Sequence, residues 1–457
     1  MTHREQHSEQ WPVGRLMLAV AVASLGALPA EAQTLSDSVQ SLSGSGTVFG
    51  AVTHTRQDTD TGRESNTRPS LGVSGDIGGS LQRGANNLDL RYGGTLETER
   101  DLPNDDQTDS SSLSGAARYN YFNPGGRLDF NLGHTIESVR EDTGFVLNSG
   151  DYDTRNTLNG GAGLNLYPGE LSRLRLSAQA GKSFSSGELE EGESWTTEAS
   201  FGRQLTKRSE GTLTVRRSWA EQEQNGQQQD TTIDTAELGY NRQLESGKFS
   251  LVVGASQSET EFPNQAGEQD GEAMTGHLER VWSGPEASTT VRYSRRLSDS
   301  ATELSLNLPP ELAFLPDSVQ LRDLVVSDSL LLAHSTDRLC SVCRFSVWAE
   351  AERLESELTD AITHEYRAAM SLGVDMDRLH QLLVSWGWQG DAGEDSGNLN
   401  TYAHSLDIAV TRRLDEQVRV GVALNQGWVR DKDNNRDQED YGLRLFLTRD
   451  FSLMARR

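Results

Sequence analysis

Cysteine and long apolar runs are scarce in this chain of 457 residues. After residue 32, no apolar stretch approaches the roughly 18–20 residues that a membrane-spanning helix requires. Basic residues are outnumbered, with 42 Lys and Arg against 68 Asp and Glu, so the formal net charge is −26. A chain this acidic is a poor partner for nucleic acid or for an anionic lipid surface.

The only two cysteines are Cys340 and Cys343, in a C-x-x-C arrangement. That spacing fits a redox couple, half of a zinc site or a local disulfide. A zinc site needs partner ligands of comparable spacing, and a thioredoxin-like site needs a βαβ setting. The sequence offers neither. We therefore expect a structural turn at this place, with a disulfide between the two cysteines as one form of it.

The first 32 residues have the organisation of a secretory signal. Arg4 and Arg15 precede an apolar stretch from Leu16 to Ala30, and Ala30-Glu31-Ala32 gives an A-x-A cleavage pattern. No cysteine stands at that junction to carry a lipid anchor. The pattern predicts an exported protein that is not held in a membrane by a helix.

From residue 45 onward, apolar and polar side chains alternate in segment after segment. In residues 172–185, Leu174, Leu176 and Ala178 share one face while Arg175 and Ser177 share the other. A period of two predicts β-strands. The segments are about 11–15 residues long, whereas strands of soluble sandwiches average about 5–6 and a tilted membrane-spanning strand takes roughly 9–11. The length therefore favours strands that cross a bilayer.

Short turns such as 123–126 and 167–170 are separated by longer polar loops, an alternation typical of outer-membrane barrels with the short turns in the periplasm. An even strand number then places both termini in the periplasm. The first segment alternates weakly and 324–335 is irregular, so 18 or 22 strands remain alternatives to 20. The predicted segments are 45–58, 67–80, 87–99, 110–122, 126–139, 154–166, 172–185, 193–205, 211–223, 231–243, 247–260, 272–282, 287–299, 324–335, 344–356, 364–375, 380–390, 400–412, 417–429 and 439–451.

This pattern predicts an all-β protein, a single up-and-down antiparallel transmembrane barrel. The expected organisation is a signal peptide (1–32), a short periplasmic segment (33–44), the barrel (45–451) and a C-terminal tail (452–457). Only a closed barrel lets strands bond every backbone group at bilayer depth. Most tryptophans fall on the apolar parity or near strand ends, as in interfacial belts. Trp348 instead falls on the polar parity, and Arg280 on the apparent lipid face.

The last segment resembles the C-terminal strand by which the barrel-assembly machinery recognises outer-membrane proteins. The resemblance rests on one apolar row that ends in an aromatic residue, although six residues follow that aromatic. Outer-membrane lipid, lipopolysaccharide and the assembly machinery are accordingly the expected partners. The row consists of Tyr441, Leu443, Leu445, Leu447 and Phe451.

More broadly, residues 45–451 resemble the porin-type barrels found beside exopolysaccharide and exosortase (PEP-CTERM) loci. The features that carry this resemblance are the repeated hairpins and the stretch from Val325-Val326-Ser327-Asp328-Ser329-Leu330 through Arg344-Phe345-Ser346-Val347-Trp348. The resemblance implies a role in moving or anchoring secreted polysaccharide, with periplasmic export components as partners.

The longest and most apolar predicted outer loop covers residues 302–324. Loops this long are usually functional or disordered, and its leucine content disfavours disorder. It is a candidate constriction inside the lumen, and a contact on the outer rim is an equal alternative. The residues in question are Leu304, Leu306, Leu308, Leu312, Phe314 and Leu315.

No catalytic, cofactor or metal site is expected. His134, His277, His334 and His404 are scattered, without a nucleophile motif such as G-x-S-x-G. Acidic runs such as 431–440 lack the spacing of an EF-hand and are expected to be solvated loops. A channel is therefore the first hypothesis, because about twenty strands enclose more space than side chains fill. A non-conducting scaffold is the second hypothesis and an enzyme the third. A TonB-dependent transporter is disfavoured, because few residues precede the first strand.

Overall fold

The computed structural model describes residues 39–59, 62–102, 106–123, 125–139, 153–185, 191–224, 227–261, 268–298, 325–337, 339–356, 361–393, 399–432 and 435–452. The regular elements in these ranges form one 20-stranded antiparallel sheet. The strands are β1 (Val39–Thr59), β2 (Gly62–Arg83), β3 (Asn86–Asp101), β4 (Asp106–Phe122), β5 (Leu128–Val139), β6 (Asp153–Gly169), β7 (Ser172–Ser185), β8 (Glu191–Thr206), β9 (Ser209–Gln224), β10 (Gln227–Leu244), β11 (Gly247–Glu261), β12 (Glu268–Ser283), β13 (Ala287–Ser298), β14 (Val325–Thr336), β15 (Cys343–Ser356), β16 (Ile362–Asp375), β17 (His380–Gly393), β18 (Thr401–Arg413), β19 (Val418–Asp431) and β20 (Arg436–Ser452).

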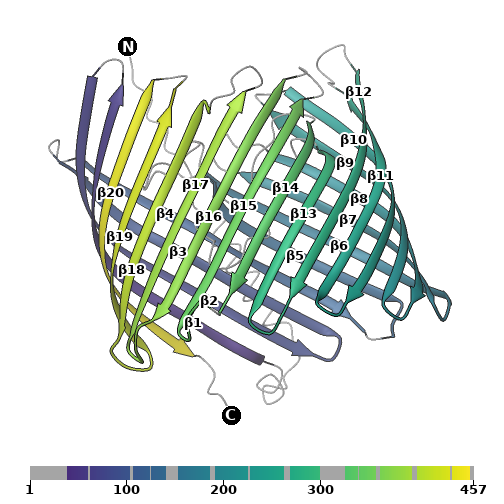
Figure 1. Ribbon diagram of the computed structural model, residues 1–457, viewed down its shortest axis with the longest axis horizontal. Helices are drawn as coiled ribbons and strands as arrows, with labels where there is room; N and C mark the ends of the chain where they lie inside the picture. Colours follow the sequence, from purple (N-terminus) through teal and green to yellow (C-terminus); the bar gives the residue numbers. More distant parts are fainter. Residues whose placement is uncertain are drawn as a thin grey trace, which may run out of the picture.

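The sheet closes on itself because the first strand pairs with the last. β1 pairs with β2 along one edge and with β20 along the other, from Ser43 opposite Ser452 to Asp58 opposite Asp437. Every other strand pairs with its neighbours in sequence. Figure 1 shows the strands inclined in one sense across the near wall and in the opposite sense across the far wall, as tilted strands of one cylinder must be. The chain is an all-β, closed, antiparallel barrel.

The alternation in the sequence predicted every strand of this barrel. The segment 172–185 is β7 with unchanged bounds. The largest differences are at the start, where β1 begins at Val39 and β2 at Gly62, several residues before the predicted starts. These two strands pair with each other up to Thr59 opposite Gly62. Backbone hydrogen bonding therefore continues after the apolar alternation has faded.

The irregular segment at 324–335 is β14, and packing explains its irregularity. Its first residues are buried on both faces, with Val325, Val326 and Ser327 exposed by only 6%, 2% and 1%. Val326 clusters with Leu297 of β13 and with Ile233 and Ala273, which belong to β10 and β12. A strand end that is covered on both sides has no need of a polar face, so its sequence does not alternate.

The two faces of the barrel differ in chemistry along most strands, although the ion pair of Arg217 with Asp234 lies on the outer parity. Large apolar side chains on one parity are solvent-exposed in the isolated chain; Leu132, Leu238 and Leu445 are examples. Side chains on the concave face crowd together, and many polar residues there are buried, such as Ser258, Ser327 and Thr260. The apolar face is therefore the outside of the cylinder and the polar face its interior.

Aromatic pairs on the outer face mark both edges of the apolar zone. Near the rim of the short turns lie Tyr121 with Phe130 and Tyr240 with Phe249; at the other edge lie Trp195 with Trp219 and Tyr402 with Trp428. Trp219 is eight residues along β9 from Gly211, the partner of Tyr240. That separation is about 27 Å along a strand and, at a tilt of about 40°, about 21 Å across the barrel, close to the roughly 25 Å apolar band of outer-membrane barrels.

An apolar zone of this height with two aromatic girdles identifies a transmembrane barrel. Arg280 fits this arrangement, although it lies on the outer face. It is close to the end of β12, with its Cζ 4.9 Å from the ring centroid of Trp282, and it donates a hydrogen bond to the carbonyl oxygen of Lys248. No helix in the described part of the chain is long and apolar enough to cross a membrane.

The longest connections lie at one rim of the barrel. The connections from an even-numbered to the next odd-numbered strand are short, such as 84–85 between β2 and β3 and 207–208 between β8 and β9. The two longest, at 140–152 and 299–324, both run from an odd-numbered to an even-numbered strand. The start of β1 and the end of β20 lie at the rim of the short turns, because β1 begins where β2 ends.

Candidate functional site: the inner wall of the barrel

One sector of the inner wall carries a chain of ion pairs across β11, β12 and β13. Glu279 lies between two cations, with Lys248 Nζ 2.7 Å from one carboxylate oxygen and Arg292 Nη2 2.6 Å from the other. The Glu279 side chain is only 5% exposed. Burial of a carboxylate is costly unless it is paired and hydrogen-bonded, and here both oxygens are paired.

The charged sector continues onto β15 and β16. Ser327 donates a hydrogen bond to Glu352, with the oxygens 2.5 Å apart. Arg367 of β16 lies 3.9 Å from the carboxylates of Glu350 and Glu352 and pairs closely with Glu365. These side chains are largely buried. This part of the wall, on β15 and β16, is consequently held by ion pairs and covered, rather than open to a solute.

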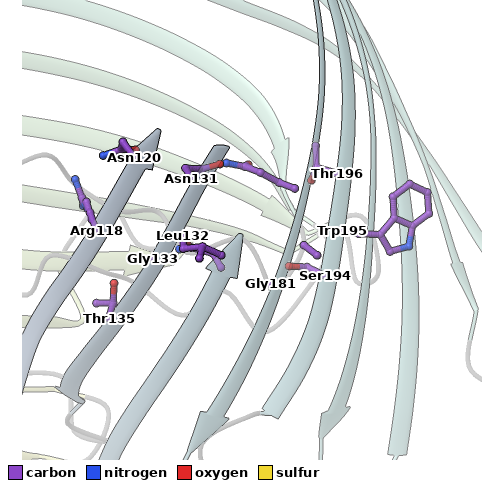
Figure 2. A pocket seen from close by; sticks show the side chains of 13 residues that line it. Arg118, Asn120, Asn131, Leu132, Gly133, Thr135, Gly181, Ser194, Trp195 and Thr196 are labelled. Atoms are coloured by element: carbon purple, nitrogen blue, oxygen red, sulfur yellow. The ribbon is translucent and has the colours of Figure 1, made fainter. Parts of the chain in front are cut away.

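A second sector of the inner wall, on β4 to β8, carries its charges in ion pairs such as Arg175 with Asp129. It borders a hollow of about 390 Å³. Neutral hydrogen-bonding side chains predominate around it, and Figure 2 shows residues of β4, β5, β7 and β8 gathered there. Among the described residues that line the hollow, Arg118 is the one ionisable residue. The principal neutral polar side chains are those of Asn120, Asn131, Asn159, Gln179, Ser194 and Thr196.

Two glycines keep this hollow open. A Cβ placed on Gly133 would collide with the Asn159 side-chain oxygen, and a Cβ on Gly181 would lie 3.0 Å from the Ser194 hydroxyl. Both glycines face the interior, because Gly133 is opposite Arg118 of β4 and Gly181 is opposite Ser194 of β8. The bare backbone at these positions forms the floor on which the amide side chains lie.

The amide side chains that line the hollow make no hydrogen bond to another side chain among the described residues. Arg118, Asn120, Asn159 and Gln179 are exposed to the interior. Among the described residues, no hydrogen bond from another protein group holds the side-chain amides of Asn131, Asn159 or Gln179. Trp195 also borders the hollow, but its indole lies to one side of the amide group (Figure 2) and belongs to the outer parity.

The candidates from the sequence lie elsewhere. A disulfide joins Cys340 to Cys343 in the β14–β15 turn, with the Cα atoms 5.0 Å apart. Leu304, Leu306, Leu308, Leu312, Phe314 and Leu315 lie outside the described residues. The row of Tyr441, Leu443, Leu445, Leu447 and Phe451 is on the outer face of β20, and each of these side chains is exposed in the isolated chain. Its use as an assembly signal stays a prediction.

The histidines do not form one site. His134 contacts the Tyr92 hydroxyl at 2.7 Å and His334 contacts the Thr289 hydroxyl at 2.8 Å, both on the outer parity. His404 packs against Trp428, also outside, while His277 faces the interior opposite Val252. Within the described ranges, no three His, Cys, Asp or Glu side chains are grouped to hold a metal ion.

Sequence reasoning identified the polar face but missed the amide-lined hollow. The missing signal was the combination of inward glycines with inward Asn and Gln on consecutive strands. It could be read only after the register was known, because Gly133 is opposite Asn159 across the β5–β6 pair.

No family model and no curated protein matches this chain. Solved structures that resemble it are outer-membrane barrels. The ferric-catecholate import receptor Fiu of E. coli K12 has 7% identity and a TM-score of 0.45, with 88% of this chain and 81% of that chain covered. The unliganded ferric citrate transporter FecA has 9% identity and a TM-score of 0.49, with 90% and 79% covered.

Pseudomonas aeruginosa OpdO has 13% identity and a TM-score of 0.40, with 92% of this chain and 99% of that chain covered. Similarity at this level carries no inference about a substrate. The assignment as a transmembrane barrel therefore rests on the closed strand pairing, the apolar outer zone and the aromatic girdles described above.

Proposed function

We propose that this protein is an outer-membrane channel through which hydrophilic molecules pass. The observation that carries the proposal is the accessible polar sector on β4 to β8, inside a closed barrel of 20 strands. Barrels of this size enclose more space than side chains alone fill. Accessible amides and hydroxyls on that wall replace the hydration of a polar solute in transit.

Exported polysaccharide is the cargo we propose, in keeping with the resemblance to barrels beside exopolysaccharide loci. The proposal extends to its surroundings: outer-membrane lipid and lipopolysaccharide around the barrel, the assembly machinery at the outer row of β20, and periplasmic export components at the rim of the short turns. Both ends of the chain would then lie in the periplasm.

A scaffold barrel without conduction is the second candidate, and one observation favours it. Much of the other inner sector is covered: the side chain of Glu352 is 4% exposed and that of Glu350 is 8% exposed. A lumen filled on that side leaves a narrower path. The two candidates differ in whether current flows through the barrel.

Two adjacent threonines of β8 provide a matched test. Thr196 faces the interior opposite Gln179, and Thr197 faces outward opposite Ala178. Each is replaced by cysteine in a background in which Cys340 and Cys343 are serine, and the protein is reconstituted in planar lipid bilayers. A bulky thiol reagent should reduce the conductance of Thr196→Cys and leave that of Thr197→Cys unchanged. Folded, heat-modifiable protein that never conducts would favour the scaffold.

A further inference from the structure

We infer that the amide-lined hollow on β4 to β8 is a binding subsite for a neutral polyhydroxylated ligand, that is, an uncharged sugar chain. The inference rests on the proposed function, because it names the class of solute that the channel would hold. It is carried by the chemistry of the hollow, by its shape and by the contrast with the charged sector of the same wall.

Amides and sugars match in their hydrogen bonding. Each Asn or Gln side chain offers one acceptor oxygen and two N–H donors. A sugar hydroxyl likewise donates one hydrogen bond and accepts others. Asn131 of β5 and Gln179 of β7 lie at one level, on either side of Gly161 of β6, and Asn159 of β6 lies two residues further along. Together they form a group of mixed donors and acceptors across three strands, which can bond several hydroxyls of one chain.

The surrounding charges disfavour an ionic ligand. Acidic and basic groups on this part of the inner wall neutralise each other: Arg175 of β7 lies 2.8 Å from Asp129 of β5, and Arg216 of β9 lies 2.8 Å from Glu198 of β8. Arg118 alone contributes a charge to the lining, and a guanidinium donates equally well to hydroxyl oxygens. A polyanion would need several uncompensated cations, which the described residues of this sector do not supply.

The size and the floor suit a sugar ring. A volume of about 390 Å³ is at the lower end of the roughly 300–1,000 Å³ of small-molecule sites. Gly133 and Gly181 leave room at the wall for the side chains of Asn159 and Ser194, so these side chains lie against the wall and leave the hollow above them to a ring. No aromatic ring faces the hollow from the inner parity among the described residues. Binding should therefore be weak, as suits a solute that must move on.

The test uses the full-length protein in nanodiscs, with maltohexaose as the neutral probe and a hexamer of uronic acid as the charged one. Binding is measured by saturation-transfer NMR and by reduction of the bilayer current. Asn159→Leu combined with Gln179→Met keeps the shapes and removes the hydrogen bonds. For two lost hydrogen bonds we expect about tenfold weaker binding of maltohexaose.

Gln57→Met is the matched control, because Gln57 is an inner-wall amide on β1, away from the hollow. It should bind maltohexaose as the native protein does. Gly181→Ala is the second variant: it narrows the floor without changing polarity, and it should also weaken binding. If the double variant fails to form the heat-modifiable barrel, two other results test the subsite. They are the binding of maltohexaose by Gly181→Ala and the preference of the native protein for maltohexaose over the uronic acid hexamer.

The inference is overturned if the uronic acid hexamer binds as well as or better than maltohexaose, or if the folded variants bind like the native protein. A native protein that conducts but does not bind maltohexaose contradicts the subsite while the channel stands. A native protein that binds maltohexaose through these residues but does not conduct contradicts the channel while the subsite stands.

Discussion

The guanidinium of Arg444 lies over the ring of Phe49, with Cζ 3.6 Å from the ring centroid, on the strand pair that closes the barrel. Phe49 of β1 is 4% exposed and faces the interior opposite Phe446 of β20. A Cβ on Gly72 of β2 would collide with the Phe49 ring, and a Cβ on Gly421 of β19 would collide with the Phe446 ring. The closing strands are thus held by two rings, each lying over a glycine of the next strand.

The closing contact should matter for the stability of the whole barrel. Phe49→Ala removes a buried ring and the cation–π contact with Arg444, so we expect a loss of about 3–5 kcal/mol, as for a buried phenylalanine. The measurement is unfolding by guanidinium chloride in detergent. A second measurement is the temperature above which the protein no longer migrates in SDS gels as the folded barrel. Phe122→Ala, at an exposed strand end, is the control and should change little. Equal effects of the two would refute the closing role of Phe49.

A charge placed on the outer apolar zone should be costly in proportion to its depth. Leu424 is 50% exposed on the outer face of β19, between the two aromatic girdles. Leu424→Arg should cost about 2–4 kcal/mol, and the cost should fall to about 0–1 kcal/mol near the interface. Leu414→Arg, in the β18–β19 turn, is the matched substitution outside the zone. Folding equilibria in lipid vesicles measure both, and a Leu424→Arg cost no larger than that of Leu414→Arg would contradict a membrane-facing surface.

Glu279 should contribute more to stability than a surface carboxylate. Glu279→Gln leaves Lys248 and Arg292 without their shared partner, and we expect a loss of about 1–3 kcal/mol. Glu245, whose pair with Arg208 is at 3.8 Å and largely accessible, is the control, since surface pairs are worth about 0–1 kcal/mol. Chemical unfolding at low and high salt gives the loss in free energy of unfolding for Glu279→Gln and for the corresponding substitution of Glu245. Indistinguishable losses would show that the inner ion pairs do not stabilise the barrel.

The β16–β17 turn carries a pH-dependent contact. The hydrogen bond with the His380 ring, together with the backbone N–H groups of Leu379 and His380, lowers the pKa of Asp377 from 3.8 to about 2. Because the folded pKa is below the unfolded one, this stabilisation is fully present above about pH 4. It is lost as the pH falls through about 2.

An NMR titration of the Asp377 carboxyl carbon tests this directly. The midpoint should lie near pH 2. The Asp377→Asn variant should differ from the native protein in thermal stability at pH 6 and converge with it toward pH 2. A carboxyl that titrates near pH 4 would show that the turn contacts are not maintained.

The orientation of the barrel can be tested by surface labelling. In a background with Cys340 and Cys343 replaced by serine, Lys432→Cys and Glu170→Cys place single thiols at opposite rims, in the β19–β20 and β6–β7 connections. A reagent that does not cross the membrane should label position 432 on intact cells and reach position 170 only after the envelope is permeabilised. The reverse result would place both chain ends outside the cell.

Local sequence determined the strands and their faces, because a period of two depends only on neighbouring residues. Residues 172–185 show this most clearly, since the predicted bounds and the apolar face of β7 are those of the structure. Connection lengths likewise predicted the number of strands and the rim at which both ends of the sheet lie. The row from Tyr441 to Phe451 could be assigned to one face for the same reason.

Register and closure were decided only by the tertiary structure, because both depend on which residues of separate strands pair, and closure places Thr47 of β1 opposite Thr448 of β20. Trp348 faces the interior and is 3% exposed; the small Ala369 stands opposite it on β16 with no exposed surface. Val326 is buried on a face that alternation alone assigns to the outside. The hollow on β4 to β8 exists because pairing aligns inward glycines with inward amides on successive strands, a coincidence that no single segment encodes.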